Sequence, residues 1–417
     1  MHRASRSSFA DLPPGLFLVN RAPGKSLRTG RRKGTLTTAR AHTIWTDRFL
    51  EYDFGPFHPF SERSRGLAAR LLRSVVPASR PSPLGWSESV DVAQRSTLES
   101  FHLSEYLEFV ERASGLEREV LLDAGDTPAF RGCYEASARL VQGAVDALDF
   151  TIEHRRPAFH PAGGLHHAHP GRASGFCIFN DVAIAVARGL RHQHRVAYVD
   201  IDAHHGDGVM YGFYESGRVL DIDFHQDGRT LFPGTGFPYE VGREDGAGLK
   251  ANIPLPPGAG DEALLPIFRR VVPTLLRWFR PDVIVLQHGV DGHYGDRLAQ
   301  LQYSPAAYAE IDRTILALSE ELTGGRLLVT GGGGYRAESV SRVLARTGLI
   351  LAGLPVPEDA SPLPSAWRDE FTANIGTDAP ETWADRPELE PSPWNDNLEK
   401  NLIGQLEAKL GERFPAP

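Results

Sequence analysis

Residues 195–207 read RVAYVDIDAHHGD, and this stretch decides the fold class. Its first half is an apolar, partly β-branched run with the length of a buried β-strand. Its second half is polar and carries Asp202, His204 and Asp207. In parallel α/β sheets, ligands bind beyond the carboxyl ends of the strands. We therefore expect a ligand site directly after this strand.

Three further runs have the same character, and each ends in polar or glycine-rich residues. The four predicted strands cover residues 195–202, 218–225, 282–290 and 326–331. The clusters at their carboxyl ends contain Asp223 with His225, Asp291 with His293, and the run Gly331–Tyr335. Since parallel strands end at the same edge of a sheet, we expect these clusters to converge on one site.

Helical patterns alternate with these strands. We expect helices over residues 61–74, 134–154, 180–192 and 262–279, and a fifth that begins at Ser304 and Pro305. Asp181 is a candidate cap of the third helix, and Pro273 should kink the fourth. A Pro/Ser-rich loop is predicted at residues 77–85. Strands that alternate with helices imply a mostly parallel sheet covered on both faces. The expected fold class is therefore α/β, in a single domain.

Length and composition are those of an ordinary globular protein, with 417 residues, 41% hydrophobic and 24% charged. The two cysteines, Cys133 and Cys177, argue against a disulfide framework and for a reducing compartment. The chain has no run of about 18 apolar residues, so we expect no membrane helix. We therefore expect a cytoplasmic location.

The charges are distributed unevenly. The first 40 residues hold nine Lys and Arg and one acidic residue, whereas the remainder holds 36 basic and 52 acidic residues. We interpret residues 1–42 as a basic, disordered extension; a transit peptide or a nucleic-acid-binding arm is the alternative. Residues 43–417 form the expected globular domain, with an irregular C-terminal wrap over 354–417. Its acidic character favours cationic substrates over nucleic acid.

Asp202, His204 and Asp291 form a candidate metal site. Strand side chains alternate with period two, so Asp202 and His204 point to the same side and can reach one ion. Asp291 adds a third ligand from another strand. Three protein ligands with an open position are typical of catalytic zinc, although Fe²⁺ also accepts such an oxygen-rich set.

Two neighbouring histidines occur in the glycine-flanked stretch Gly163–Ala168, GGLHHA. A tight loop of this kind can turn both imidazoles, His166 and His167, into one cavity. The carboxylates of Asp200 and Asp207 could fix their tautomers and raise their pKa. Two such pairs would supply a proton acceptor and an electrostatic partner.

The run Gly331–Tyr335, GGGGY, lets the backbone approach a ligand closely. It lacks the Lys-Ser/Thr of a phosphate-binding P-loop. We interpret Tyr335 as a hydrogen-bond donor to a developing oxyanion.

Seven motifs together resemble the histone deacetylase superfamily, and more closely its prokaryotic branch of acetoin utilisation proteins. They occur in the family's order between about Thr43 and Gly353: Tyr52–Pro59, Gly163–Ala168, Ser174–Asp181, Tyr198–Gly208, Leu231–Gly236, Val290–Asp296 and Gly331–Tyr335. The resemblance implies an arginase/deacetylase fold and zinc-dependent deacetylation of acetyl-lysine in a protein or peptide.

The resemblance also implies roles for particular residues. The metal ligands are Asp202, His204 and Asp291, and Tyr335 is the oxyanion donor. His167, held by Asp207, is the general base and then the acid, and His166 with Asp200 tunes the site.

For the substrate, the resemblance implies a narrow tunnel walled by Phe176 and Phe232 near Gly175. Asp126 is a rim carboxylate that grips substrate backbone amides. A structural K⁺ ion is implied at Asp200, residue 223 and the carbonyls of Asp202 and His204.

Three positions bear on the charge of the K⁺ site and on the choice of substrate. Asp223 stands where family members generally have serine, which changes the charge of the K⁺ site. Arg297 stands where proline is usual. Leu298 stands where polyamine deacetylases have glutamate, which favours acyl-lysine and leaves acetylpolyamines or other small N-acyl-amines as the alternative.

Two more distant alternatives remain. A ureohydrolase shares the fold and the Asp-Ala-His of residues 202–204, but its dinuclear site needs carboxylates where this chain has Gly206 and His293. A catalytically silent binding module has no support, because all the expected catalytic residues are present. The oligomeric state is left open.

Overall fold

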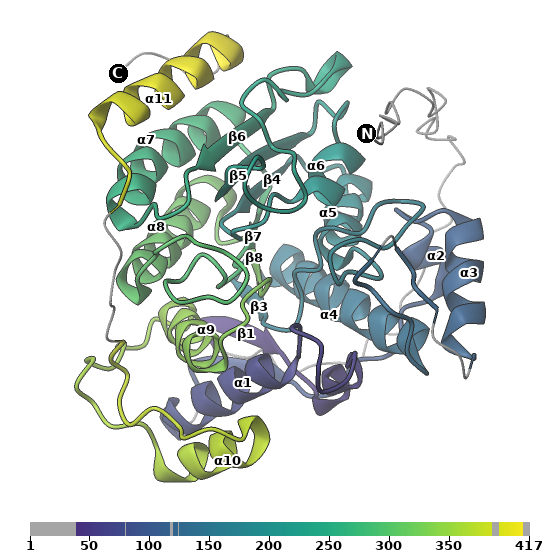
Figure 1. Cartoon of the computed structure of the whole chain (residues 1–417), viewed down its shortest axis with the longest axis vertical. Helices are drawn as coiled ribbons and strands as arrows, with labels where there is room; N and C mark the ends of the chain where they lie inside the picture. Colours follow the sequence, from purple (N-terminus) through teal and green to yellow (C-terminus); the bar gives the residue numbers. More distant parts are fainter. Residues whose placement is uncertain (1–38, 80, 117–119, 124, 386–391, 412–417) are drawn as a thin grey trace, which may run out of the picture. The chain divides into compact units, whose positions relative to one another are not determined.

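The computed structural model describes residues 39–79, 81–116, 120–123, 125–385 and 392–411 (Figure 1). Eight strands form one sheet in the order β2-β1-β3-β8-β7-β4-β5-β6, and all pairings between them are parallel. The strands are β1 (Ala41–Ile44), β2 (Leu84–Ser87), β3 (Ala158–His160), β4 (Val196–Asp200), β5 (Val219–Gln226), β6 (Lys250–Leu255), β7 (Val283–Gln287) and β8 (Leu327–Thr330). The α/β prediction is confirmed.

Helices connect and cover these strands. The described helices are α1 (Arg63–Val75), α2 (Arg95–Leu98), α3 (Ser104–Ser114), α4 (Cys133–His154), α5 (Asp181–Arg191), α6 (Asp207–Gly212), α7 (Asp261–Phe279), α8 (Pro305–Thr323), α9 (Ala337–Leu351), α10 (Ser365–Ile375) and α11 (Asp396–Leu410), with short 3₁₀ turns η1 (Asp47–Glu51) and η2 (Glu244–Gly246). No helix in the described ranges has both the length and the apolar character needed to cross a bilayer.

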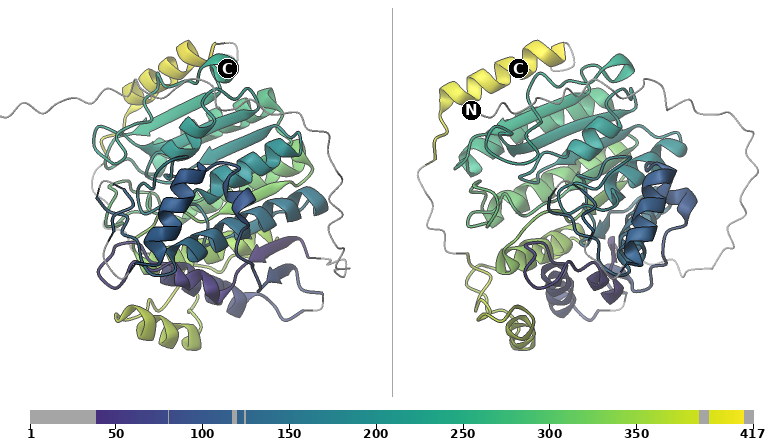
Figure 2. Two further views of the ribbon diagram at one scale, coloured as in Figure 1. Left: turned by 90° about the vertical axis from the view of Figure 1, so that its right-hand side faces the viewer. Right: turned by 45° about the vertical axis from the view of Figure 1, so that its right-hand side comes forward.

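The sheet is buried on both faces because its strands are apolar on both sides. In β4, Val196 and Tyr198 pack into a core with α3, α4 and α5. Ala197 and Val199 point the other way, into a core with α1, α7, α8 and α9. Figure 1 shows α4 and α5 on one side of the sheet and α7 and α8 on the other, and Figure 2 shows the same layers from two further directions.

The four predicted strands and all five predicted helices are present, with bounds that differ by at most three residues. The helix at 180–192 begins differently from our expectation. Asn180, not Asp181, is its cap, because the Asn180 side chain accepts the N–H of Ala183 at 2.8 Å. Asp181 instead contributes to the site described below.

Other expectations were wrong or incomplete. The irregular wrap over 354–417 contains α10 and α11, and Trp367 and Trp383 are buried there. Strands β1, β2, β3 and β6 were not predicted, and β2 begins inside the loop expected at 77–85. Of the extension assigned to residues 1–42, residues 1–38 lie outside the described ranges, while Ala41 and His42 belong to β1.

Candidate metal centre and active site

The site lies at the carboxyl ends of four neighbouring strands, β3, β8, β7 and β4. The segments that follow these strands carry the His166–His167 pair, the glycine run ending at Tyr335, Asp291, and Asp202 with His204. Three of the four predicted clusters therefore converge as expected. The fourth component of the site is the His166–His167 pair, in the segment that follows β3. The fourth predicted cluster, Asp223 with His225 in β5, lies beside Asp200 instead.

The three predicted metal ligands come together. One ligand atom from each of Asp202, His204 and Asp291 lies within 4.8 Å of the other two, and all three residues are buried. His204 Nδ1 lies 2.8 Å from Asp291 Oδ2 and 3.4 Å from Asp202 Oδ1. Two carboxylates and one imidazole nitrogen thus face a common point, which fits a divalent cation.

The charges at this point favour a cation. Burial alone would lower the pKa of His204, but its hydrogen bonds to Asp202 and Asp291 outweigh burial and raise this pKa to about 10. Burial and the neighbouring Asp202 raise the pKa of Asp291 to about 8. Burial opposes ionisation of Asp202 too, yet His166 and His204 hold its pKa below the usual range. Buried carboxylates of this kind require a positive partner.

The glycine run approaches the ligands rather than a phosphate. The Gly333 N–H donates to Asp202 Oδ2 at 2.6 Å. A methyl group on Gly333 would overlap Asp291 Oδ2 and lie 2.9 Å from Asp202 Oδ2. Only glycine fits here, because the backbone itself lines the metal centre.

Both histidines of the loop after β3 are paired with carboxylates, as expected. His166 Nδ1 lies 2.8 Å from Asp200 Oδ2, and His167 Nδ1 lies 2.8 Å from Asp207 Oδ1. Each Nδ1–H donates to its carboxylate, so each Nε2 faces the cavity. Burial, with His166 next to it, lowers the pKa of His167 to about 4. His167 is therefore neutral at pH 7 and able to accept a proton.

Asp181 supports this loop and was not predicted as a site residue. Its carboxylate accepts the backbone N–H groups of Gly164, at 3.0 Å, and Leu165, at 2.7 Å. These bonds fix the backbone directly before the two histidines. Asp181 ends the motif Ser174–Asp181, which was the only sequence signal for this role.

Tyr335 lies next to the metal ligands. Its ring is 6.2 Å from the ring of His204, and its backbone N–H donates to Asp296 Oδ2 at 2.9 Å. Burial and the carboxylates of Asp291 and Asp202 raise the pKa of Tyr335 well above its ordinary value. The hydroxyl therefore keeps its proton and can act as a donor.

Aromatic rings flank the approach to the site. The Phe232 ring lies 5.1 Å from that of His167, and the Phe176 ring lies 6.0 Å from that of Tyr335. A side chain on Gly175 would begin 2.6 Å from His167 and 2.8 Å from Phe232. Gly175 therefore lies directly between Phe232 and the candidate base His167.

The two remaining predicted substrate contacts lie farther out. Asp126 is exposed; burial of its carboxyl and a hydrogen bond with Asp123 raise its pKa, whereas the charge of His167 lowers it. Leu298 is half-buried, and its N–H donates to Asp296 Oδ1 at 2.9 Å. The same Asp296 thus holds the backbones of Leu298 and Tyr335.

His293 does not join the metal cluster. Its Nδ1 lies 2.6 Å from the carbonyl oxygen of Tyr294, and its Nε2 lies 3.0 Å from Asp385 Oδ2. Asp385 also forms a buried ion pair with Arg342 of α9. The ring of His293 therefore braces the segment that carries Asp291, and the cluster described here has ligands for one metal ion.

Asp223 pairs with Asp200 in register between β5 and β4. Its carboxylate accepts the N–H of Gly206 at 2.8 Å and lies 2.7 Å from His225 Nδ1. A side chain on Gly206 would begin 2.6 Å from Asp200 Oδ2 and 3.2 Å from Asp223 Oδ2. Two buried carboxylates therefore face the same small space.

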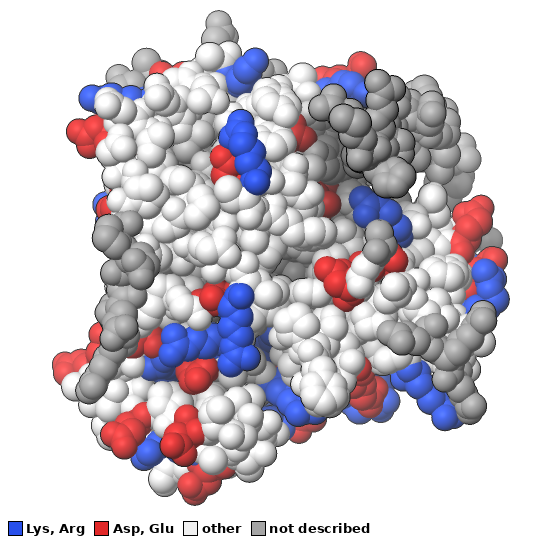
Figure 3. Space-filling view, viewed as in Figure 1, with Lys and Arg blue, Asp and Glu red and all other residues white. Residues whose placement is uncertain are grey.

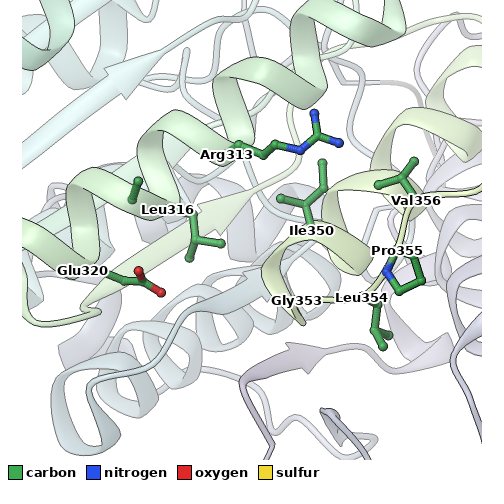
Figure 4. Close-up of a pocket in the computed structure, with 9 residues that line it drawn as sticks. Arg313, Leu316, Glu320, Ile350, Gly353, Leu354, Pro355 and Val356 are labelled. Atoms are coloured by element: carbon green, nitrogen blue, oxygen red, sulfur yellow. The ribbon is translucent and has the colours of Figure 1, made fainter.

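The cavity at the candidate site is narrow. Its lining includes His166, His167, Asp202, Gly333 and Tyr335, and its volume is about 10 Å³, roughly the space of one water molecule. A larger cavity of about 410 Å³ lies between α8 and the end of α9 (Figure 4). Arg313 and Glu320 are the charged residues of that lining, which contains no metal-ligating cluster. The chemistry therefore belongs to the smaller cavity.

The surface charges are mixed on the face seen in Figure 3. Lys and Arg side chains lie there in small groups beside Asp and Glu. This face does not present the continuous basic surface that nucleic-acid binding uses.

Comparison with known proteins agrees with this geometry. The histone deacetylase domain family matches residues 58–350. The chain belongs to the histone deacetylase family, whose members are hydrolases that act on acylated amines.

Among the relatives, the acetoin utilization protein AcuC of Staphylococcus xylosus is 34% identical over 354 residues, covering 83% of this chain and 90% of the relative. AcuC of Bacillus subtilis (strain 168) is 34% identical over 359 residues, covering 84% and 90%. Among solved structures, the HDA15 HD domain superposes with a TM-score of 0.67 at 27% identity, covering 75% of this chain and 91% of that domain.

Proposed function

We propose that this chain hydrolyses the amide bond of acetylated lysine side chains in a protein or peptide, with Zn²⁺ or Fe²⁺ as its metal. The observation that carries the proposal is the buried Asp202–His204–Asp291 cluster next to the His166–His167 pair. A metal site alone has many uses, but a metal site beside a neutral, carboxylate-held imidazole is equipped for hydrolysis.

The metal ion, held by Asp202, His204 and Asp291, would polarise the amide carbonyl and lower the pKa of the attacking water. His167 Nε2 accepts a proton from that water as it attacks. The Tyr335 hydroxyl donates a hydrogen bond to the oxygen on which negative charge develops. His167 then returns the proton to the leaving amine, and the products are a carboxylate and a free amine.

His166 influences these reaction steps through the charge of its imidazole. Its Nε2 lies 3.1 Å from that of His167 and 3.9 Å from Asp202 Oδ1. Two protonated imidazoles at this separation repel each other, so the pair carries one extra proton at a time. His166, bonded to Asp200, thereby limits how strongly His167 holds its proton.

The proposed substrate follows from the approach to the site. Phe176 and Phe232 offer apolar walls for an extended methylene stem, and Leu298 adds an apolar side chain where a polyamine would favour a carboxylate. We expect Asp126 to accept backbone N–H groups of a peptide. A small acetylpolyamine has no such backbone, and it remains the second candidate.

The proposal is tested by kinetics on an acetyl-lysine peptide and on an acetylated polyamine, using protein loaded with Zn²⁺ or with Fe²⁺. We expect a higher kcat/KM for the peptide. Preference for the polyamine would support the second candidate. Inactivity on both substrates in protein with one bound metal ion would contradict the deacetylase proposal.

We also propose a structural K⁺ ion at Asp200, Asp223 and the carbonyl oxygens of Asp202 and His204. Burial and the neighbouring Asp223 raise the pKa of Asp200, and a cation between the two carboxylates would favour their ionised forms. Asp223 adds a negative charge compared with serine, so the ion is expected to bind more tightly here.

A further inference from the structure

Arginine residues precede six neighbouring strands of the sheet. In the sheet order β1-β3-β8-β7-β4-β5, each strand begins one to three residues after an arginine (Figure 1). We call these residues the arginine row; in the same order they are Arg40, Arg156, Arg326, Arg280, Arg195 and Arg218. All these strands are parallel, so the row lies at the edge of the sheet where the strands begin. The metal centre lies at the opposite edge, where they end.

The register of the strands places members of the row side by side. The pairings of β1 with β3 and of β3 with β8 put Arg40, Arg156 and Arg326 at matching positions. The pairing of β4 with β5 does the same for Arg195 and Arg218. Neighbouring strands lie about 4.8 Å apart, so the row extends over about 24 Å. A line of charges with this length suits an extended ligand.

Most of the row has no acidic partner. In the described part of the chain, no carboxylate oxygen lies within 4.0 Å of the guanidinium nitrogens of Arg40, Arg195, Arg218, Arg280 and Arg326. Other surface arginines do have such partners, at 2.6 to 2.8 Å: Arg243 with Glu215, Arg269 with Glu310, and Arg277 with Glu321. The row therefore carries positive charge that the protein does not pair.

The surrounding groups offset this charge only in part. Asp282 directly precedes β7, and its carboxylate accepts the backbone N–H of Arg195 at 2.7 Å. Helices α4, α5, α7 and α8 end at the same edge, and each helix C-terminus contributes about −0.5 charge. Together with Asp282 they supply about −3 against six arginines. Burial lowers the pKa of Arg326, and the like charge of Arg155 lowers it further.

Contacts inside the protein leave donors of the row available. Arg218 Nη1 donates to a carbonyl oxygen in the last turn of α5 at 3.1 Å, and Arg326 Nη1 donates to the last residue of α8 at 2.8 Å. Each guanidinium has five N–H donors, so one such bond leaves others free. The Arg195 guanidinium lies 4.1 Å over the ring of Phe279, and a stacked guanidinium keeps its N–H groups in its own plane.

We propose that the arginine row docks an extended acidic segment of a partner protein, with Asp or Glu at alternate positions over about seven residues. An extended segment of this length spans about 24 Å, as the row does. Guanidinium groups bind carboxylates through two parallel hydrogen bonds. This docking surface is separate from the metal centre, and it does not depend on the proposed function.

A peptide fits this edge better than a nucleic acid does. The last carbonyl oxygens of a helix lack partners within the helix, and a peptide backbone has N–H groups that can donate to them. Phosphate oxygens only accept hydrogen bonds, so they are repelled by these carbonyl groups. The net charge of −8 on the chain also disfavours a long polyanion.

The test is the binding of a fluorescently labelled peptide of this length to the full chain, measured by anisotropy. The peptide carries Glu at alternate positions, and its matched control carries Gln at the same positions. We expect the Glu peptide to bind and the Gln peptide to show no binding. The affinity should fall as the salt concentration rises, because salt screens exposed charges.

The triple variant Arg40→Gln/Arg218→Gln/Arg280→Gln removes three exposed members of the row. It should weaken binding of the Glu peptide by about tenfold, since each exposed ion pair contributes roughly two- to threefold. Melting temperatures check that the variant is folded. If it is not, the single variants Arg218→Gln and Arg280→Gln replace it, each with an expected loss of about two- to threefold.

The matched control is Arg243→Gln/Arg269→Gln/Arg277→Gln, which changes the net charge equally at arginines that already have acidic partners. It should bind the Glu peptide within about twofold of the wild type. Equal losses in the two triple variants would overturn the inference, because net charge alone would then explain them. Absence of binding to the wild type would overturn it as well. Tighter binding of a single-stranded oligonucleotide of equal charge would show that the row serves a nucleic acid instead.

Discussion

At the scale of single residues, the two Nε2 atoms of His166 and His167, 3.1 Å apart, set the acid–base behaviour of the site. Each histidine has its own carboxylate, yet their surroundings differ. His166 lies 3.9 Å from Asp202 of the candidate metal cluster, whereas the His167 ring lies 5.1 Å from the Phe232 ring. In the proposed mechanism, His167 is therefore the base and His166 its electrostatic partner.

We therefore expect His167→Ala to reduce kcat/KM by about 10²- to 10⁴-fold, the usual contribution of a general base. His166→Ala should cause a smaller loss, because it removes an electrostatic partner only. Steady-state kinetics of both variants decide the order. A greater loss in His166→Ala would reverse our assignment of the base.

The same pair predicts the pH dependence. His167 must be neutral to accept a proton, and its pKa is lowered to about 4 in the folded protein. A positive ion nearby lowers this pKa further. Activity should therefore persist as the pH falls through 6.5, the ordinary histidine value, and decline only at lower pH. A pH profile of kcat/KM with its acid limb at or above 6.5 would contradict this.

Tyr335→Phe tests the oxyanion donor. Removal of one such donor costs about 10²- to 10³-fold in kcat. The Tyr335 hydroxyl has no part in the metal cluster, so the variant should keep its bound metal ion, measurable by elemental analysis. Loss of the metal in Tyr335→Phe would show that we have misassigned its role.

At the scale of secondary-structure elements, the sequence predicted those site residues that directly follow a recognisable strand. Asp202, His204 and Asp291 follow long apolar runs. The β-branched residues in these runs identify them as strands. Strands β1 (AHTI), β2 (LGWS) and β3 (AFH) are short and contain histidine, glycine or serine, so they lack the continuous apolar run that marks the equally short β8 (LLVT). Strand β6 contains Lys250 and Pro254, and it lies at an edge of the sheet where proline is tolerated.

Residues that act through distant contacts could not be predicted. Asp385 lies 92 residues from His293, the residue that it holds beside Asp291. No spacing rule connects such positions, because the fold alone brings them together. Asp181 was noticed as a helix cap, since an acid at a helix start normally has that role.

The glycine run gives a prediction at this scale. Gly333→Ala should abolish metal binding, because its methyl group would overlap Asp291 Oδ2 and crowd Asp202. Gly404→Ala in α11 is the matched control, since a methyl group there meets no atom within 4 Å. Metal content and kcat/KM measure the effect. A metal-loaded, active Gly333→Ala protein would contradict the described close approach.

At the scale of the whole molecule, the metal centre is tied to the C-terminal region. Asp385 bonds to His293 beside the ligand Asp291 and pairs with Arg342 of α9. Arg346, also of α9, pairs with Asp359 and donates to the carbonyl oxygen of Trp383 at 2.9 Å. Stability of the C-terminal region and order at the metal centre are therefore coupled.

Removal of the metal should lower the stability of the whole protein, because Asp202 and Asp291 would lose their buried counter-ion. An ion present at 100 times its Kd stabilises the folded state by about 2.7 kcal/mol. The melting temperature should fall on addition of a chelator and recover with Zn²⁺. Asp202→Asn, which lacks a ligand charge, should respond much less; an equal response would place the stabilising ion elsewhere.

The position of β8 also orders the assembly of the protein during synthesis. β8 lies between β3 and β7, so it is the strand that joins β2-β1-β3 to β7-β4-β5-β6. The first group, which ends at His160, must wait until Thr330 has left the ribosome, on the order of ten seconds at ~5–20 residues per second. The histidine pair follows the first group, whereas all three metal ligands lie in the second. A nascent chain that ends before β8 therefore contains the histidine pair and the three metal ligands, but it lacks the strand that joins the two groups and the Tyr335 that follows it.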